Sequence, residues 1–424
     1  MNNIDHRKSQ SRSRVRVAYH SNIRQIAGIL LSITFLCILH NVNAQGIQLS
    51  EDSQISLITI LPGDAPEELF GHSAIRVQDL QNNIDLSYNY GTFHFDAFFL
   101  PKFIYGDLEY FLSVAHYSAS RRYYLEQQRP IIEQVLNLTL SQKQDLFEFL
   151  RVNAQEEYRY YQYDFLFDNC STRIRDLFEH VLGDDIRFSP EMASGFTFRD
   201  MIHLYVNHRP FIQSGMDLLL GNRVDHIITT RETMFLPDFL MKEFDHATIL
   251  VNGEIQPFVA TTKLPSHFPD EISNAGQPWA VLLTWALFMA GAVITYKNYR
   301  DSKIFERWFD LPLFTVTGLI GLLILFLWFI SLHNVTVNNL NLLWAWPTHL
   351  FLIPFLFRRP NSVLLPAAYL SLLIISCLII LMGWSLWTQH LHPAILPILL
   401  LLIIRSGWIA LRVKNEAAKV KREN

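Results

Sequence analysis

The sequence predicts an α+β domain outside the cytoplasm, followed by an all-α membrane region. Three features predict this division: a basic and then apolar N-terminus, a middle part of ordinary soluble composition, and a C-terminal part with few charges. The chain has 424 residues, 50% hydrophobic and only 17% charged, whereas soluble domains average about 25% charged residues. This composition, with a net charge of -4, excludes a disordered chain and a nucleic-acid binder that depends on bulk positive charge.

The first 44 residues are predicted to be a secretory signal. Basic residues from Arg7 to Arg24 precede an apolar core of 14 residues, Ile26 to Leu39. Val42-Asn43-Ala44 then offers a small-residue cleavage site before Gln45. An uncleaved anchor helix is the alternative, and either form carries the following residues across the membrane.

Residues 45–261 are long enough for one domain with a substantial core. Alternating and β-branched patterns predict strands at 55–61, 73–77 and 85–90, with Asn82-Asn83 as the turn between the last two. Helices are expected at 142–152 after a Ser141 cap, from Asp168 or Asn169 to Leu182, and around 198–207. The aromatic stretch 98–110, FFLPKFIYGDLEY, fits either an interfacial surface or ordinary core. Residues 262–278, rich in proline, are expected to link this domain to the membrane.

Residues 279–411 are predicted to be a membrane region of five helices, because they carry only ten charges between long apolar runs. The expected spans are 279–296, 312–332, 342–357, 363–385 and 393–411. Basic loops alternate with loops that lack Lys and Arg, which places the soluble domain outside and the basic tail, 412–424, in the cytoplasm. The third span is short and contains Pro347 and Pro354. Arg405, inside the last span, is interpreted as snorkelling towards the inner face, with a lipid-phosphate contact as the alternative.

One of the three cysteines, Cys170, lies in the exported domain, since Cys37 belongs to the signal and Cys377 to the fourth span. From this count alone, an inert buried thiol and a reactive one are both open. Cys170 falls in the first turn of a predicted helix, where the helix dipole and free N–H groups favour a thiolate and can line an oxyanion hole. Arg173 adds a positive charge one turn later. Cys170 is therefore the candidate nucleophile.

A cysteine nucleophile needs a base, and His72 is the main candidate. It follows Gly71 at the mouth of a predicted strand, facing a helix-borne cysteine in a papain-like arrangement. A structural histidine bonded to backbone is the alternative. Other residues have further expected roles: a second candidate base at His94, surface positions at His116 and His180, and orientation of the base by Tyr90 or Asp96.

Four segments together resemble the Lnb family of bacterial lipoprotein N-acyltransferases. They are LFGHSAIRV at 69–77, NYGTFHFD at 89–96, LNLTLSQK at 136–143 and YQYDFLFDNCSTRIRD at 161–176. The resemblance covers residues 50–260 well, and the membrane region agrees in position and number of spans. His94 departs from the family, where an acidic residue is commoner.

The resemblance implies a permuted papain-like α+β fold, similar to NlpC-type hydrolases and lecithin:retinol acyltransferases, with histidine before cysteine in the chain. It also implies that Cys170 is the nucleophile and His72 the base. Asn169 and Arg173 are further candidates for oxyanion support or orientation.

The implied reaction moves an acyl chain from a phospholipid to the N-terminal amine of a diacylglyceryl-cysteine lipoprotein. The expected partners are the phospholipid donor, the diacylated lipoprotein and membrane lipids, and the expected location is the bacterial inner membrane with the catalytic domain in the periplasm. No cofactor, metal or nucleic acid is expected, since no corresponding motif is visible. Two alternatives stay open: a membrane-anchored cysteine amidase or peptidase acting on cell-wall peptides, and a non-enzymatic envelope assembly module with Cys170 buried.

Overall fold

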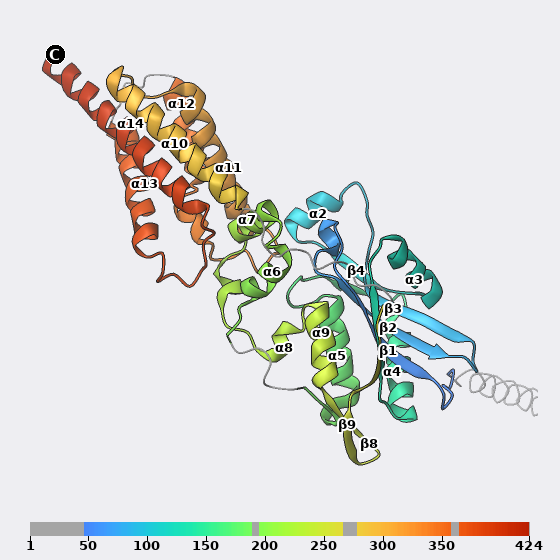
Figure 1. Cartoon of the computed structure of the whole chain (residues 1–424). Helices are drawn as coiled ribbons and strands as arrows, with labels where there is room; N and C mark the ends of the chain where they lie inside the picture. The colour runs from blue at the N-terminus through green and yellow to red at the C-terminus, as the bar shows by residue number, and fades with distance from the viewer. Residues whose placement is uncertain (1–45, 189–194, 266–277, 358–363, 424) are drawn as a thin grey trace, which may run out of the picture. The chain divides into compact units, whose positions relative to one another are not determined.

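A computed structural model describes residues 46–188, 195–265, 278–357 and 364–423. The chain is mixed α+β, sheet-rich up to Lys263 and helical after it, as expected (Figure 1). The predicted signal, 1–44, and most of the predicted linker lie outside the described residues. Residues 52–424 cluster into one compact unit.

A seven-stranded sheet organises the N-terminal part, in the order β10-β5-β1-β2-β3-β4-β6, and all its neighbouring pairs are antiparallel. Its strands are β1 (Gln54–Ile60), β2 (His72–Asp79), β3 (Ile84–Phe93), β4 (Glu109–His116), β5 (Ile131–Leu136), β6 (Tyr160–Gln162) and β10 (Val259–Lys263). A second sheet contains β7 (Ile186–Arg187), β8 (Thr248–Val251) and β9 (Glu254–Pro257). The three predicted strands and the turn at Asn82-Asn83 are confirmed, and Asn83 takes the left-handed conformation that the turn needs.

Helices cover both faces of the large sheet, with α5 and α9 on one face and α3 on the other (Figure 1). The helices of this part are α2 (Phe99–Tyr105), α3 (Tyr117–Glu126), α4 (Leu140–Asn153), α5 (Cys170–Leu182), α6 (Phe198–Val206), α7 (Pro210–Leu219), α8 (Thr230–Thr233) and α9 (Pro237–His246). Short 3₁₀ turns occur at η1 (Pro66–Glu68), η2 (Gly183–Asp185) and η3 (Asn222–Asp225).

The predicted helix after residue 169 is confirmed, but the cap expected at Ser141 is wrong. Thr139 caps α4 instead: its hydroxyl accepts the Gln142 N–H, and the Gln142 side chain accepts the Thr139 N–H. This reciprocal capping box satisfies two N–H groups that a serine cap two residues later would leave free. Ser141 lies inside the first turn of α4.

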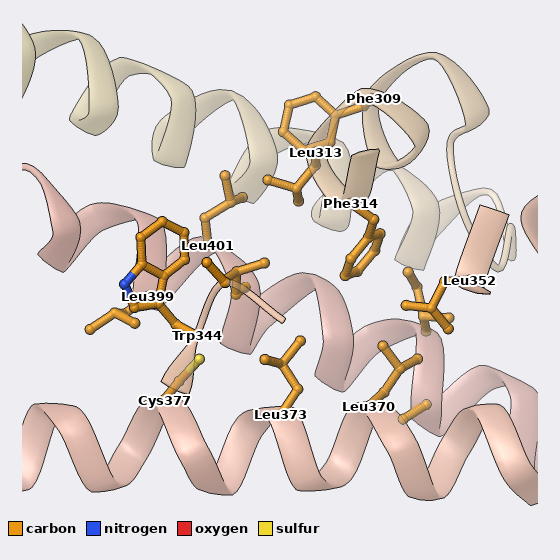
Figure 2. Close-up of a cluster of buried hydrophobic side chains, with 14 of the residues drawn as sticks. Phe309, Leu313, Phe314, Trp344, Leu352, Leu370, Leu373, Cys377, Leu399 and Leu401 are labelled. Carbon is orange, nitrogen blue, oxygen red and sulfur yellow. The ribbon is translucent and has the colours of Figure 1, made fainter. Parts of the chain in front are cut away.

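Among the described residues, four helices are long and apolar enough to cross a membrane. They are α10 (Trp279–Arg300), α11 (Arg307–Phe329), α13 (Leu364–Met382) and α14 (Ile395–Glu423). Their buried side chains form an apolar cluster that includes Phe314, Leu373 and Leu401 (Figure 2). These helices correspond to four of the five predicted spans.

The remaining predicted span, 342–357, is not one continuous helix. It forms η4 (Leu340–Leu343), η5 (Pro347–Phe351) and α12 (Leu352–Phe357). Trp344, at the break before Pro347, is buried in the apolar cluster (Figure 2). Side chains take up the carbonyls that the break frees: Ser376 Oγ donates to Leu343 C=O at 2.5 Å, and His349 Nε2 donates to Trp344 C=O at 3.0 Å. Irregular backbone is tolerated at membrane depth only where protein satisfies it in this way.

Arg405 of α14 neither snorkels to the interface nor faces lipid, so both interpretations of it were wrong. Its side chain is fully buried, and it forms a bidentate ion pair with the buried Asp310 of α11 at 2.7 and 2.5 Å. Its third nitrogen donates to the hydroxyl of Thr295 in α10 at 2.9 Å. The charge is therefore neutralised inside the helix bundle, where an unpaired charge would be costly.

The segment that follows α11 contacts the N-terminal part through backbone and amide groups. The Gly221 N–H donates to Val335 C=O at 2.9 Å, and Asn339 Nδ2 donates to Leu218 C=O at the same distance. Asn334 Nδ2 donates to the carboxylate of Asp164 at 2.8 Å. These bonds tie α7 and the turn before α5 to the membrane helices.

Candidate active site

Cys170 is the first residue of α5, and its position is set by the residue before it. The Asn169 Oδ1 accepts the N–H groups of Ser171 and Thr172 at 2.8 and 3.0 Å, and the Thr172 hydroxyl accepts the Asn169 N–H at 2.7 Å. The Asn169 Nδ2 donates to two backbone carbonyls. Asn169 is thus engaged as a helix cap rather than as an oxyanion donor. The Cys170 N–H is the donor in this turn that the capping box does not use.

His72 is the first residue of β2, directly after a backbone position that only glycine fills well. Gly71 has a φ of 75°, and a Cβ there would lie 2.7 Å from the carbonyl oxygen of Ile60. The imidazole that follows is close enough to the Cys170 thiol for its charge and hydrogen bonding to lower the pKa of that thiol. The structure therefore brings together the two residues that the sequence singled out.

Asn89 of β3 orients the His72 imidazole, and sequence reasoning missed it. Asn89 Oδ1 lies 2.8 Å from His72 Nε2 and also accepts the Gly91 N–H at 2.7 Å. The Gly91 N–H can only donate, so the amide oxygen is the atom that faces both groups. His72 Nε2 must then carry a proton, which leaves Nδ1 as the basic nitrogen for the thiol. Gly91 is needed here because a Cβ would lie 2.4 Å from the imidazole.

The surroundings of Cys170 favour its thiolate. Burial raises the pKa of the thiol, but the positive charge and hydrogen bond of His72 outweigh burial, with help from the Ser73 N–H and the Ser171 hydroxyl, so the pKa of Cys170 is lowered overall. The two serine hydroxyls also contact each other at 3.0 Å, which joins β2 to α5 beside the thiol. The surroundings of the thiol therefore favour its ionisation.

The pKa direction predicts how Cys170 responds to pH when it is alkylated by iodoacetamide. Because the pKa of the thiol is lowered, a larger fraction of it is ionised in wild type than in His72→Ala at any pH below that pKa, and we expect alkylation at pH 6 to be at least about tenfold faster in wild type. In His72→Ala, burial would be the main remaining influence on the Cys170 thiol, and burial raises its pKa. Peptide mass spectrometry between pH 5 and 10 measures the rate, and Asn89→Ala should move the profile in the same direction by less. Coincident profiles for wild type and His72→Ala would show that His72 does not act on the thiol.

Three other predicted site residues have partners of their own. Tyr90 is buried, and its carbonyl accepts the Tyr161 hydroxyl. Arg173 pairs with Asp168 at 2.5 Å and lies over the Tyr161 ring. Asp96 forms an ion pair with Lys102 at 3.1 Å, and both side chains are about half exposed. Within the described residues, none of the three hydrogen-bonds to His72 or Cys170.

The remaining histidines lie outside the pair. His94 is exposed and stacks on Phe111, with ring centroids 4.9 Å apart. His116 and His180 are exposed, which confirms the surface positions expected for them.

Tyr110 and Tyr163 form an aromatic wall near the thiol, and their phenols stay protonated. The sequence patterns did not reveal this wall. Tyr110 and Tyr163 stack with ring centroids 4.2 Å apart. Burial, and then the negative charge of a Cys170 thiolate, raise the pKa of both phenols, so they stay neutral hydroxyl donors. An apolar wall with phenolic donors suits an uncharged acyl group better than a charged one.

Two family models match the chain. One, described as the Lnb N-terminal periplasmic domain, matches residues 46–203, a range that includes both His72 and Cys170. The other, described as the Lnb transmembrane domain, matches residues 272–416. No curated protein and no solved structure matches the chain significantly.

Proposed function

Because the chain belongs to the Lnb family, we propose that it moves an acyl chain from a phospholipid to the N-terminal amine of diacylglyceryl-cysteine lipoproteins. Membership indicates a membrane-associated enzyme of lipoprotein processing. The observation that carries the finer proposal is the placement of His72, which is hydrogen-bonded to Asn89 and lowers the pKa of the Cys170 thiol. Covalent acyl transfer needs a nucleophile, a base beside it and a group that orients the base, and Cys170, His72 and Asn89 fit these three roles. A permuted papain-like fold, with the histidine strand before the cysteine helix, is part of this proposal.

In the first half-reaction, the Cys170 thiolate attacks the ester carbonyl carbon of the phospholipid. A C–S bond forms, the C–O bond to the glycerol oxygen breaks, and the His72 imidazolium gives its proton to that leaving oxygen. The oxyanion of the tetrahedral intermediate can accept from the Cys170 N–H and from a tyrosine phenol of the wall. The products are a lysophospholipid and a thioester on Cys170.

In the second half-reaction, the α-amine of the lipoprotein attacks the thioester carbonyl. A C–N bond forms and the C–S bond breaks, while His72 Nδ1 takes the proton released by the amine. The amide product leaves, and the thiolate and imidazolium are restored. Water would hydrolyse the thioester, so an aromatic surrounding and a site near lipid both favour transfer over hydrolysis.

The topology follows from charge placement. We propose that the protein is multi-pass in the bacterial inner membrane, with the domain that holds Cys170 in the periplasm. The basic tail, 412–424, would lie in the cytoplasm, as the distribution of Lys and Arg favours. A membrane location suits the reaction because both substrates carry acyl chains.

Reconstitution tests the proposal directly. The full chain in proteoliposomes is expected to convert a diacylated lipopeptide with a free N-terminus to the N-acylated form and to release an equal amount of lysophospholipid, both measured by mass spectrometry. Initial rates should follow ping-pong kinetics, since the acyl group rests on the enzyme between substrates. The matched control is the same lipopeptide with an acetylated amine, which should accept nothing. Absence of transfer, with cleavage of cell-wall peptides by the same preparation, would replace this proposal with the amidase.

A further inference from the structure

Helix α2 presents large apolar side chains outward instead of burying them. Phe98, Leu100 and Phe103 are 68%, 64% and 48% exposed, and α2 has no buried residue. The sequence left core and interfacial surface as alternatives for the stretch 98–110, and this exposure excludes core for its helical part. A cluster of this kind on one helix marks a binding surface.

The end of a membrane-length helix holds α2 in place. Just after α11, the Leu332 N–H donates to Tyr105 C=O at 2.7 Å, and His333 Nε2 donates to Phe103 C=O at 2.7 Å. Phe329 and Ile330, at the end of α11, are themselves 68% and 57% exposed. Exposed apolar side chains are therefore present both on α2 and at the end of α11, next to the contact that joins them.

We call these exposed residues together the α2 surface: Phe98, Leu100, Phe103, Ile104, Phe329, Ile330 and Leu332. The ion pair of Lys102 and Asp96 is half exposed on the same helix region, where a polar rim would meet headgroups. Since α11 is long and apolar enough to span a membrane, a surface attached to its end lies at the height of the lipid interface.

A row of aromatic rings leads from α2 towards the catalytic cysteine. Phe99 of α2 stacks on Phe93 at 5.1 Å, Phe93 contacts Tyr110 at 4.9 Å, and Tyr110 stacks on Tyr163 at 4.2 Å between centroids. Tyr110 and Tyr163 are close enough to Cys170 to feel its charge. Packed aromatic rings therefore extend from the α2 surface towards the thiol.

We propose that the α2 surface is embedded in the outer leaflet of the membrane and that the acyl donor reaches Cys170 along the aromatic row behind it. The first half of this inference concerns a lipid surface and is independent of the chemistry. The second half rests on the proposed acyl transfer. The competing interpretation is that another protein, and not lipid, covers the α2 surface, and the experiment below distinguishes these two occupants.

Spin labels measure the depth of the α2 surface in the bilayer. The full chain, with its three cysteines replaced, receives a label through Phe98→Cys or, as control, Leu80→Cys. Leu80 is 78% exposed in the turn at the far end of β2 from His72. In vesicles of phosphatidylethanolamine and phosphatidylglycerol, we expect label 98 to collide more with oxygen than with a water-soluble nickel chelate, and label 80 to do the reverse. Equal nickel accessibility at both sites, or shielding of label 98 only when lipoprotein is added, would overturn the proposal.

Activity measurements test delivery of the donor. In the Phe98→Asp/Leu100→Asp double variant, we expect the apparent KM for vesicle phospholipid to rise at least tenfold, because two charges oppose insertion. Transfer from a water-soluble short-chain acyl thioester should be unchanged, and Leu80→Asp should leave both rates as in wild type. Loss of both rates together in the double variant would refute delivery. If wild type transfers nothing while label 98 remains in lipid, the proposed function fails and the lipid surface stands.

Discussion

Replacement of Cys170 by serine is expected to leave the N-terminal cysteine of the lipoprotein with a free amine. The serine hydroxyl has no lowered pKa to exploit, so it stays protonated where the thiol ionises, and we expect the transfer rate to fall by about 10⁴-fold or more. In cells that depend on this protein, mass spectrometry of lipoprotein N-terminal peptides should then show diacyl forms in place of triacyl forms. The acyl-enzyme thioester, which hydroxylamine cleaves, should also disappear.

His72→Ala is expected to give the same diacyl peptides, since the two residues act as one unit and their losses are not additive. Cys377→Ala is the matched control, because Cys377 is buried in the membrane cluster and contacts no catalytic residue there (Figure 2). It should retain wild-type transfer. Triacyl peptides from the Cys170→Ser strain would refute the cysteine mechanism, whatever the result for His72→Ala.

Asn89 shows that more of the site was predictable than the residue patterns alone revealed. The turn at Asn82-Asn83 fixes the register of β2 and β3, in which Asp79 pairs with Ile84 and Ile75 with Tyr88. The paired residues end there, but counting on in the same register sets His72 opposite Gly91, with Asn89 on the same face and Tyr90 on the other. In the structure Gly91 and Asn89 do lie against the imidazole. Counting residues from the turn would therefore have selected Asn89 over Tyr90.

The capping and membrane errors have different causes. Thr139 and Ser141 are both good caps, and each has a glutamine three residues later, Gln142 and Gln144, so the local capping pattern fits both positions equally. The break at Pro347 was visible as a short, proline-containing span. Of the two groups that take up its freed carbonyls, His349 lies in the 3₁₀ turn just after the break, but Ser376 comes from α13. A hydrogen bond from another helix to a freed carbonyl leaves no periodic pattern in the sequence, so the sequence alone does not predict it.

The partner of Arg405 was also out of reach, because 95 residues separate it from Asp310. Breaking the ion pair of Arg405 and Asp310 is expected to have the second large effect, a loss of stability. We expect Asp310→Ala to lower the free energy of unfolding by about 3–5 kcal/mol, because the guanidinium would stay buried without a counter-charge. Thermal unfolding in detergent, followed by intrinsic fluorescence, measures the loss. Thr295→Val, which removes one hydroxyl that accepts from the guanidinium, should cost less, about 2 kcal/mol.

The double variant Asp310→Leu/Arg405→Leu decides whether charge pairing or mere packing is at stake. If the cost of Asp310→Ala arises from an uncompensated charge, removing both charges should restore most of the stability, because desolvation of the ions is then avoided as well. If the two side chains mainly fill space between α10, α11 and α14, the double variant should be as unstable as the single one. Since the pair lies in the membrane bundle, away from His72 and Cys170, the restored protein should also regain transfer activity. If the double variant is stable but inactive, the ion pair has a role in the reaction in addition to its role in stability.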